Sequence, residues 1–325
     1  MTQIGDDIEL AASLLKAGKL VAIPTETVYG LAANAYNLKA VASIFEAKNR
    51  PFFDPLILHC ASAKAGFALL DNYPPQFDFL ASKYWPGPLT LAAPKVAIVP
   101  DMITAGSPIV AVRVPAHPLT LRLLTAIDFP LAAPSANPFG YVSPTTAQHV
   151  QAQLGDKVDY ILDGGSCQIG IESTILGYKD NAIELWRLGG ISIENIEETV
   201  GEKLAVKIHK SSNPDVSGQL DKHYSPTTQM DLLDKKDFEK RVLVMDEHER
   251  SQTALLVFGE TMNLQGFGSV LNLSAKADTY EAAHHLYAFI RQLDAASYKK
   301  IIALRLPEIG LGRAINDRLQ RAASK

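Results

Sequence analysis

Apolar runs of strand length alternate with helical patterns along most of the chain. Runs typical of buried strands occupy residues 19–23, 56–59, 89–93, 109–114, 131–133, 158–162, 173–176 and 183–188. Apolar residues recur at helical spacing over residues 38–47, 118–127 and 145–154. Several expected strands follow one another without an intervening helix, so the pattern predicts an α/β fold whose sheet is mixed rather than wholly parallel.

The pattern changes near residue 207. Residues 208–228 contain few apolar side chains and two prolines, which predicts a linker of about twenty residues. A second, smaller α/β pattern follows, with expected strands at residues 241–245, 254–258 and 300–306 and an expected helix at residues 276–295. We therefore expect one domain over residues 1–207, a linker over 208–228 and a second domain over 229–325.

The composition narrows the class of protein. The chain has 325 residues, 47% hydrophobic and 20% charged, which excludes a disordered or collagen-like protein. Lys plus Arg number 31 against 35 Asp plus Glu, a formal net charge of -4. A protein whose main task is to coat nucleic acid usually needs a strongly basic face, so this class is disfavoured, although a local basic cleft is compatible with the count.

The cysteines and the N-terminus indicate a cytoplasmic protein. Cys60 and Cys167 lie far apart, with no CxxC or HExxH motif, so neither a zinc site nor a disulfide framework is expected. Two free thiols in a reducing compartment are the simpler interpretation. Residues 1–10 are acidic where a signal peptide would be basic, and no apolar run approaches the ~20 residues of a membrane span.

The common nucleotide-binding motifs are absent from the sequence. It contains no GxxxxGK[ST] motif, no GxGxxG after an expected strand and no GxSxG motif. If the protein binds a nucleotide, side-chain cations and loop amides must therefore hold the phosphates in another arrangement.

Polar residues follow the first expected strand. Thr25, Glu26 and Thr27 come directly after residues 19–23, where open α/β sheets place ligands. Thr25 or Thr27 could equally cap a following helix. The local features do not distinguish the two interpretations.

Two cations leave the expected helix at residues 38–47. Lys48 and Arg50 could simply interact with the helix dipole. However, Pro51 and Pro55 stiffen the following loop and hold both cations in a restricted volume, which suits a polyphosphate.

Two arginines lie in or beside strands that are expected to be buried. A lone buried charge costs several kcal/mol, so Arg113 must reach the rim of the sheet or meet an anion. That anion is either an Asp or Glu partner or the carboxylate or phosphate of a ligand. Arg187 poses the same question.

Several neutral polar residues are weaker candidates. Ser135 and Asn137 lie in a loop braced by prolines and could bind one ligand or form an ordinary turn. Ser143 and Ser173 belong to the same class. His59 ends an apolar strand, where a histidine is more often a satisfied core residue than a ligand-binding one.

Taken in order, these segments resemble the YrdC/Sua5 family of threonylcarbamoyl-AMP synthases. The matching motifs are Thr25-Glu-Thr-Val-Tyr-Gly-Leu31, Lys48-x-Arg50, Pro55-Leu-Ile-Leu-His59, Arg113-Val-Pro115, Pro134-Ser-Ala-Asn137, Glu172-Ser-Thr174 and Arg187-Leu-Gly189. No single segment is decisive, but the ordered set over about 180 residues is specific. The linker, which includes His223-Tyr-Ser-Pro226, and the second domain are similar to the long, Sua5-type members.

The resemblance implies a fold and a reaction. The fold would be a YrdC-like domain with a twisted mixed sheet and flanking helices, followed by a smaller Rossmann-like α/β domain. The reaction would join L-threonine, bicarbonate and ATP, used with Mg2+, into threonylcarbamoyl-AMP and pyrophosphate. A threonylcarbamoyl transferase complex would then use the product to modify certain tRNAs.

The resemblance also assigns residues, with no metal ligand and no general base among them. Lys48 and Arg50 would be catalytic. ATP would be bound by Lys48, Arg50, Asp54, Ser135, Asn137, Ser143, Arg187 and Tyr224. Threonine would be bound by Thr27, His59, Arg113 and Ser173.

The sequence departs from the family in the linker, which often reads Pro-Gly-Met and Arg-His-Tyr. Here it reads Ser217-Gly-Gln219 and Lys222-His-Tyr224, so a linker that closes over the site would lose the bidentate grip of an arginine. Two other classes remain as alternatives: an RNA-binding module with weak RNA contact, and a hydrogenase-type carbamoyl-transfer factor. The second usually carries zinc-finger cysteines that this chain lacks. We expect a monomer or a dimer.

Overall fold

A computed structural model describes residues 2–208, 216, 224–261 and 263–324. The described residues form two structural units. The first contains residues up to 139, then 143–168 and 172–216, and the second contains Gly140–Val142, Ile169–Ile171 and residues 224–324. The expected linker lies largely outside the described residues. The two short segments of the second unit lie inside the expected first domain, which the sequence did not predict.

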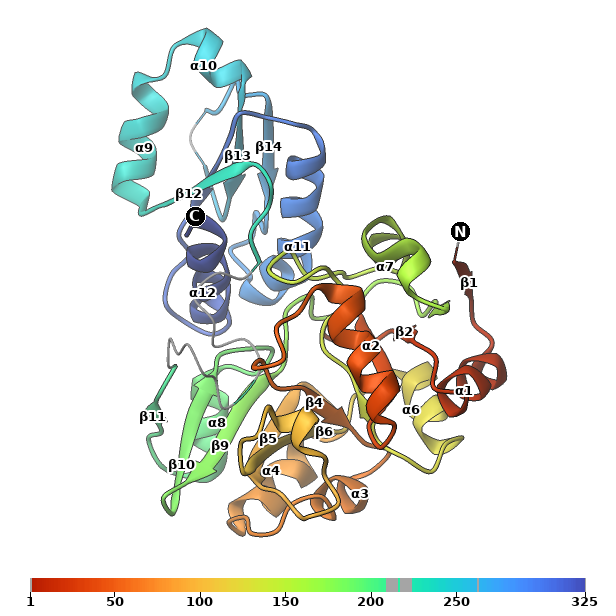
Figure 1. Ribbon diagram of the computed structural model, residues 1–325. Coiled ribbons are helices and arrows are strands. Elements are labelled where there is room, and N and C mark those ends of the chain that lie inside the picture. The colour runs from red at the N-terminus through yellow and green to blue at the C-terminus, as the bar shows by residue number, and fades with distance from the viewer. Residues whose placement is uncertain (1, 209–215, 217–223, 262, 325) are drawn as a thin grey trace. The chain divides into compact units, whose positions relative to one another are not determined.

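The first unit is built on an eleven-stranded sheet (Figure 1). In sheet order its strands are β1 (Gln3–Gly5), β8 (Tyr160–Leu162), β2 (Val21–Ile23), β3 (Gly30–Asn34), β7 (Leu131–Ala132), β4 (Ile57–His59), β6 (Ile109–Arg113), β5 (Leu89–Pro94), β9 (Thr174–Lys179), β10 (Ala182–Arg187) and β11 (Ala205–Val206). The sheet contains both parallel and antiparallel pairs, which confirms the prediction of a mixed α/β sheet.

Helices and connecting turns cover this sheet. They are α1 (Ile8–Lys16), α2 (Leu38–Lys48), α3 (Ala63–Phe67), α4 (Gln76–Tyr84), α5 (Asp101–Thr104), α6 (Pro118–Thr125), α7 (Ala147–Leu154), the 3-10 helix η1 (Gly155–Lys157) and α8 (Ile193–Val200). Helix α2 shows how local residues determine where a helix begins and ends. The Asn37 side chain accepts the amides of Lys39 and Ala40 at its start, and Asn49 takes a left-handed conformation (φ 52°) that ends it. Lys48 is thus the last residue of the helix, and Arg50 lies just beyond its cap.

The second unit contains a four-stranded parallel sheet. Its strand order is β12 (Gln229–Leu233), β15 (Lys300–Leu304), β13 (Thr253–Val257) and β14 (Ser269–Asn272), and its helices are α9 (Lys235–Val244), α10 (Glu247–Ser251), α11 (Thr279–Ala295) and α12 (Gly312–Ala323). Figure 1 draws α9 and α11 on opposite sides of this sheet. The arrangement is the expected small α/β domain with a parallel sheet.

The strand predicted at residues 241–245 is wrong, because these residues belong to helix α9 and its end. A short continuous apolar run does not distinguish a strand from a helix. Phe238 and Val242, four residues apart, are buried, whereas Leu243 and Val244 are 65% and 70% exposed. The helical spacing therefore determines which side chains are buried, and the first strand of this unit is β12, which lies before the helix.

No helix among the described residues is long and apolar enough to cross a membrane.

Candidate active site

The carboxyl ends of two neighbouring parallel strands place His59 beside Arg113. The two residues are partners in the β4–β6 register, and both side chains are buried. The amide of Cys60 continues the pairing by donating to the Arg113 carbonyl at 2.8 Å. Since ligands in open α/β sheets bind at the carboxyl ends of strands, this edge is a candidate for the binding site.

Arg113 has an acidic partner inside the protein. Its Nη2 lies 2.5 Å from Glu26 Oε1, and its Nε donates to the Gly87 carbonyl at 3.1 Å. The second Glu26 oxygen accepts the amide of Ala116 at 2.9 Å. A buried pair with these additional hydrogen bonds fixes the direction of the guanidinium. Glu26 therefore resolves the open question of how Arg113 is compensated within the protein.

The loop that carries Glu26 is a turn between β2 and β3, not the start of a helix. Thr25 Oγ1 accepts the amides of Thr27 and Val28, both at 3.1 Å, which stabilises the turn. The hydroxyls of Thr25 and Thr27 lie 2.8 Å apart. Thr27 is thus buried beside the residue that orients Arg113.

His59 is held in its neutral form. Burial, together with the positive charge of Arg113, lowers the pKa of His59 to about 3. Its Nδ1 is buried and has no hydrogen-bond partner among the described residues. A buried nitrogen of this kind is available to a polar group of a ligand.

We expect acid to destabilise the protein through His59. The ordinary histidine pKa is 6.5, and that of folded His59 is about 3. Between these two pH values the unfolded chain binds a proton that the folded protein does not, so the unfolding free energy decreases as the pH is lowered. At pH 5 the loss is about 2 kcal/mol of unfolding free energy. Guanidinium unfolding of wild type and of His59→Gln at pH 7 and pH 5 measures it. The variant should lose about 2 kcal/mol less between the two pH values; equal losses would contradict the assignment.

A second group of buried polar residues lies where β5, β9 and β10 run side by side. Arg187 donates through Nε to the Ser173 carbonyl at 3.0 Å and through Nη2 to Ser173 Oγ at 2.9 Å. Ser173 Oγ also lies 2.7 Å from Thr90 Oγ1. Sequence reasoning missed Thr90, because one threonine in an apolar strand carries no distinguishing signal.

The cations at the end of α2 and just beyond it lie around a buried carboxylate. Arg50 Nη2 is 2.8 Å from Asp54 Oδ2, and the same guanidinium donates to the carbonyls of Asp54 and Pro55. Burial raises the pKa of Asp54 above its usual value, and the charges of Arg50, Lys48 and Arg187 oppose this rise. Because Arg187 acts electrostatically on Asp54 and is also bonded to Ser173, it belongs to both groups of polar residues.

Lys48 supports the loop that contains Ser135 and Asn137. Its Nζ donates to the Ser135 carbonyl at 2.5 Å and to the Asn137 carbonyl, and its own carbonyl accepts the amide of Phe139. Burial, and then the charge of Arg50, lower the pKa of Lys48 well below its usual value. The contacts give Lys48 a positioning role, and its predicted catalytic role remains a prediction.

The remaining predicted residues fall in two places. Ser143 donates to Glu172 Oε1 at 2.8 Å, and Asn137 is buried with its Nδ2 bonded to the Pro138 carbonyl. Tyr224 belongs to the second unit, where its ring centroid lies 5.6 Å from that of Tyr287. Its predicted contact with ATP therefore remains a prediction.

Sequence reasoning gave no role to Glu26 or Glu172. Both lie inside the quoted motifs, and both accept hydrogen bonds from predicted site residues. The sequence did contain one signal for Glu26, because a buried arginine such as Arg113 requires an acidic partner or an anionic ligand. Among the described residues, no group of three or more His, Cys, Asp or Glu side chains is arranged to hold a metal ion.

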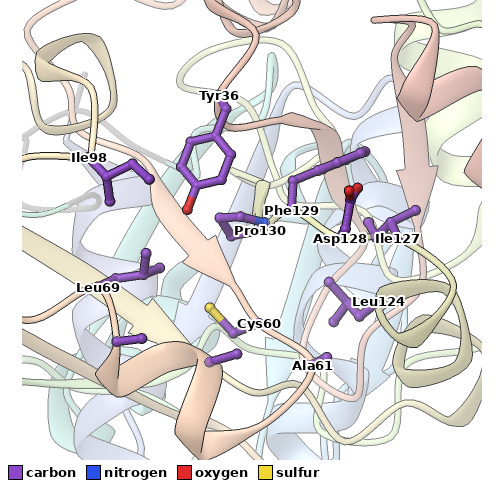
Figure 2. Close-up of a pocket in the computed structure, with 12 residues that line it drawn as sticks. Tyr36, Cys60, Ala61, Leu69, Ile98, Leu124, Ile127, Asp128, Phe129 and Pro130 are labelled. Carbon is purple, nitrogen blue, oxygen red and sulfur yellow. The ribbon is translucent and has the colours of Figure 1, made fainter.

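A pocket of about 410 Å3 is lined in part by Cys60 and Ala61, the residues that follow His59 in the chain. Unlike the polar groups described above, its lining is mostly apolar. Figure 2 shows the Tyr36 hydroxyl and the Cys60 sulfur pointing into it between apolar side chains. Burial raises the pKa of the Cys60 thiol to about 12, so the thiol is not a nucleophile at neutral pH. None of the predicted site residues lines this pocket.

Comparison with known proteins finds a matching family model for each of the two parts of the chain. A family model described as "Telomere recombination", covering Sua5, YciO and YrdC, matches residues 13–189. The chain belongs to the Sua5/YciO/YrdC family. Residues 191–324 match the C-terminal domain model of threonylcarbamoyl-AMP synthases, so this family member has the long, Sua5-type organisation.

Relatives of this Sua5-type chain align over nearly its whole length. The threonylcarbamoyl-AMP synthases of Pyrococcus abyssi and Bacillus subtilis are each 38% identical over 97% of the chain, covering 94% and 92% of those proteins. The crystal structure of Pyrococcus abyssi Sua5 complexed with L-threonine superposes with a TM-score of 0.90 at 35% identity, covering 99% of this chain and 97% of that one.

Proposed function

We propose that this protein is an L-threonylcarbamoyladenylate synthase. It would join L-threonine, bicarbonate and ATP into threonylcarbamoyl-AMP and release pyrophosphate. The observation that carries the proposal is the full-length likeness to Pyrococcus abyssi Sua5, a protein whose structure holds L-threonine. The buried cations and hydroxyls of the first unit support it independently.

The amino acid would bind at the ends of β4 and β6. Arg113, oriented by Glu26, would pair with the threonine carboxylate. The free Nδ1 of neutral His59 would accept a hydrogen bond from the threonine hydroxyl. Thr27 and Ser173 would complete the polar lining.

ATP would bind beside Asp54. Three cations, Lys48, Arg50 and Arg187, act electrostatically on this one carboxylate, and cations grouped in this way suit a triphosphate. The phosphates would also favour the protonated form of Lys48, offsetting the burial that lowers its pKa. Ser135, Asn137 and Ser143 would provide the neutral contacts.

The reaction needs two anions brought together. The threonine nitrogen attacks the carbon of CO2 derived from bicarbonate and loses a proton, which gives a carbamate. A carbamate oxygen then forms a bond to the α-phosphorus of ATP, and the bond between that phosphorus and the oxygen bridging to the β-phosphate breaks. Fixed cations lower the repulsion between the reactants, and a preformed site supplies their orientation.

We propose that Mg2+ enters with ATP as part of the substrate, because Mg2+ is usually bound through substrate phosphates and one or two carboxylates. Asp54 fits this chemistry, since its buried Oδ1 has no hydrogen-bond partner among the described residues. The product is a mixed anhydride of a carbamic and a phosphoric acid, so a transferase must accept it. We propose that this transferase uses the product to modify tRNA.

Omission of each substrate in turn tests the proposal. Pyrophosphate release should require L-threonine, bicarbonate and ATP together, and the product should contain all three components. Pyrophosphate release that does not depend on threonine would refute the substrate assignment. Binding of RNA without any turnover would favour the RNA-binding alternative.

A further inference from the structure

Two short segments connect the candidate site to helix α11 through the chain itself. Gly140–Val142 and Ile169–Ile171 belong to the second unit, although the chain on both sides of each belongs to the first. Ser143 directly follows the one and Glu172 directly follows the other. These two residues are joined by the 2.8 Å hydrogen bond already described. The position of this pair therefore depends on where both segments are held.

The first segment is held by two residues of α11. Tyr141 donates its hydroxyl to Asp294 Oδ2 at 2.5 Å, and the Arg291 guanidinium lies 5.4 Å from the centre of the Tyr141 ring. Arg291 also donates to the Val142 carbonyl, one residue before Ser143. Arg291 and Asp294 are three residues apart, so they lie on the same face of the helix.

Asp294 also holds the chain that leads into β12. Its carboxylate accepts the amides of Thr227 at 3.1 Å and Thr228 at 2.7 Å. Burial raises the pKa of Asp294, but the hydrogen bonds from Tyr141 and these amides outweigh it and hold the pKa below its usual value. The carboxylate is therefore ionised at neutral pH, and hydrogen bonds to an ionised group are stronger than those to a neutral one.

The second segment rests on the backbone of the same helix. Gly170 has φ +83°, and a Cβ there would lie 2.4 Å from the Ala283 carbonyl oxygen. Only glycine permits both this conformation and this approach. Both segments therefore contact α11, one directly before Ser143 in the chain and the other directly before Glu172.

We propose that Tyr141, Arg291 and Asp294 are positioning residues for ATP. They hold Val142 in place and thereby fix Ser143, one of the proposed ATP contacts. This inference rests on the proposed function. It adds that side chains of the second unit determine the geometry of a nucleotide contact without touching substrate.

Tyr141→Phe tests the proposal, because it removes one hydroxyl and keeps the ring against Arg291. We expect the KM for ATP to rise about tenfold, which corresponds to about 1.4 kcal/mol and to one hydrogen bond to a charged group. The kcat should stay within about twofold and the KM for threonine should not change, while loss of the hydrogen bond should lower the melting temperature by a few degrees at most. A merely structural role would lower the melting temperature without raising the KM for ATP, or would affect both substrates alike.

Two further variants sharpen the test. Tyr298→Phe is the matched control, because it removes a tyrosine hydroxyl bonded to the Gly268 carbonyl elsewhere in the second unit; its kinetics should equal those of wild type. Asp294→Ala combined with Tyr141→Phe should be no worse than Asp294→Ala alone, since removal of the carboxylate already breaks the contact with Tyr141.

The outcomes separate the two proposals. An active wild type with an unchanged KM for ATP in Tyr141→Phe, or with additive effects in the double variant, would overturn the positioning role alone. A wild type that neither binds ATP in calorimetry nor forms product would overturn the proposed function and this inference with it.

Discussion

Replacing Arg113 by alanine should raise the KM for threonine by at least about 100-fold and leave the KM for ATP nearly unchanged. The guanidinium is the proposed partner of the substrate carboxylate, and a charged hydrogen-bonded pair of this kind is worth about 3 kcal/mol. The same change should lower the unfolding free energy by about 3–5 kcal/mol, because it leaves Glu26 buried without its cation.

A double variant separates these two effects. Arg113→Ala with Glu26→Gln removes the orphaned charge as well as the cation, so stability should return in part while the KM for threonine stays high. Steady-state kinetics and guanidinium unfolding of the three proteins provide the measurement. Recovery of threonine use together with stability would show that Arg113 acts only as a structural partner of Glu26.

Replacing Lys48 by methionine should lower kcat/KM for ATP by at least about 100-fold. Methionine keeps most of the apolar stem but removes the ammonium that donates to the carbonyls of Ser135 and Asn137. Each buried carbonyl left without a partner costs about 1–3 kcal/mol, so the loop should move and the protein should lose stability. The KM for threonine should change little, because the proposed threonine contacts His59 and Arg113 lie on β4 and β6 and not at the end of α2.

Lys39→Met provides the matched control on the same helix. Lys39 is exposed, so its replacement should leave both kinetic constants and the melting temperature unchanged. Initial rates at varied ATP and threonine distinguish the two lysine variants. If Lys48→Met used ATP as efficiently as wild type, both the predicted catalytic role and the positioning contacts would lose their functional meaning.

The apolar pattern predicted the strands at the centre of the sheet. Residues 89–93 and 109–114, for example, are covered on both faces and therefore read as continuous apolar runs. Strand β3 was missed because Gly30–Asn34 is made mostly of small residues without the β-branched or aromatic side chains typical of strands. The edge strand β11 has two residues and carries no detectable pattern.

The candidate site was predicted as a set of residues but not as a set of contacts. Arg113 and Glu26 are 87 positions apart, and their pairing follows from the order of the strands in the sheet, which local patterns do not determine. The role of Lys48 as a donor to the loop at residues 135–137 was not predicted for the same reason. The placement of Gly140–Val142 in the second unit had no signal in the sequence, because the contacts that hold it involve α11, more than a hundred residues later.

In the proposed reaction, the buried cations and hydroxyls of the first unit join the carbamate of an amino acid to the α-phosphate of ATP. Incubation with carbon-13 bicarbonate, L-threonine and ATP, followed by mass spectrometry of the nucleotide products, tests this most directly. We expect a threonylcarbamoyl-AMP that carries the carbon-13 label, formed in equal amount with pyrophosphate. ADP and inorganic phosphate as the products, or an unlabelled adenylate of threonine, would contradict it.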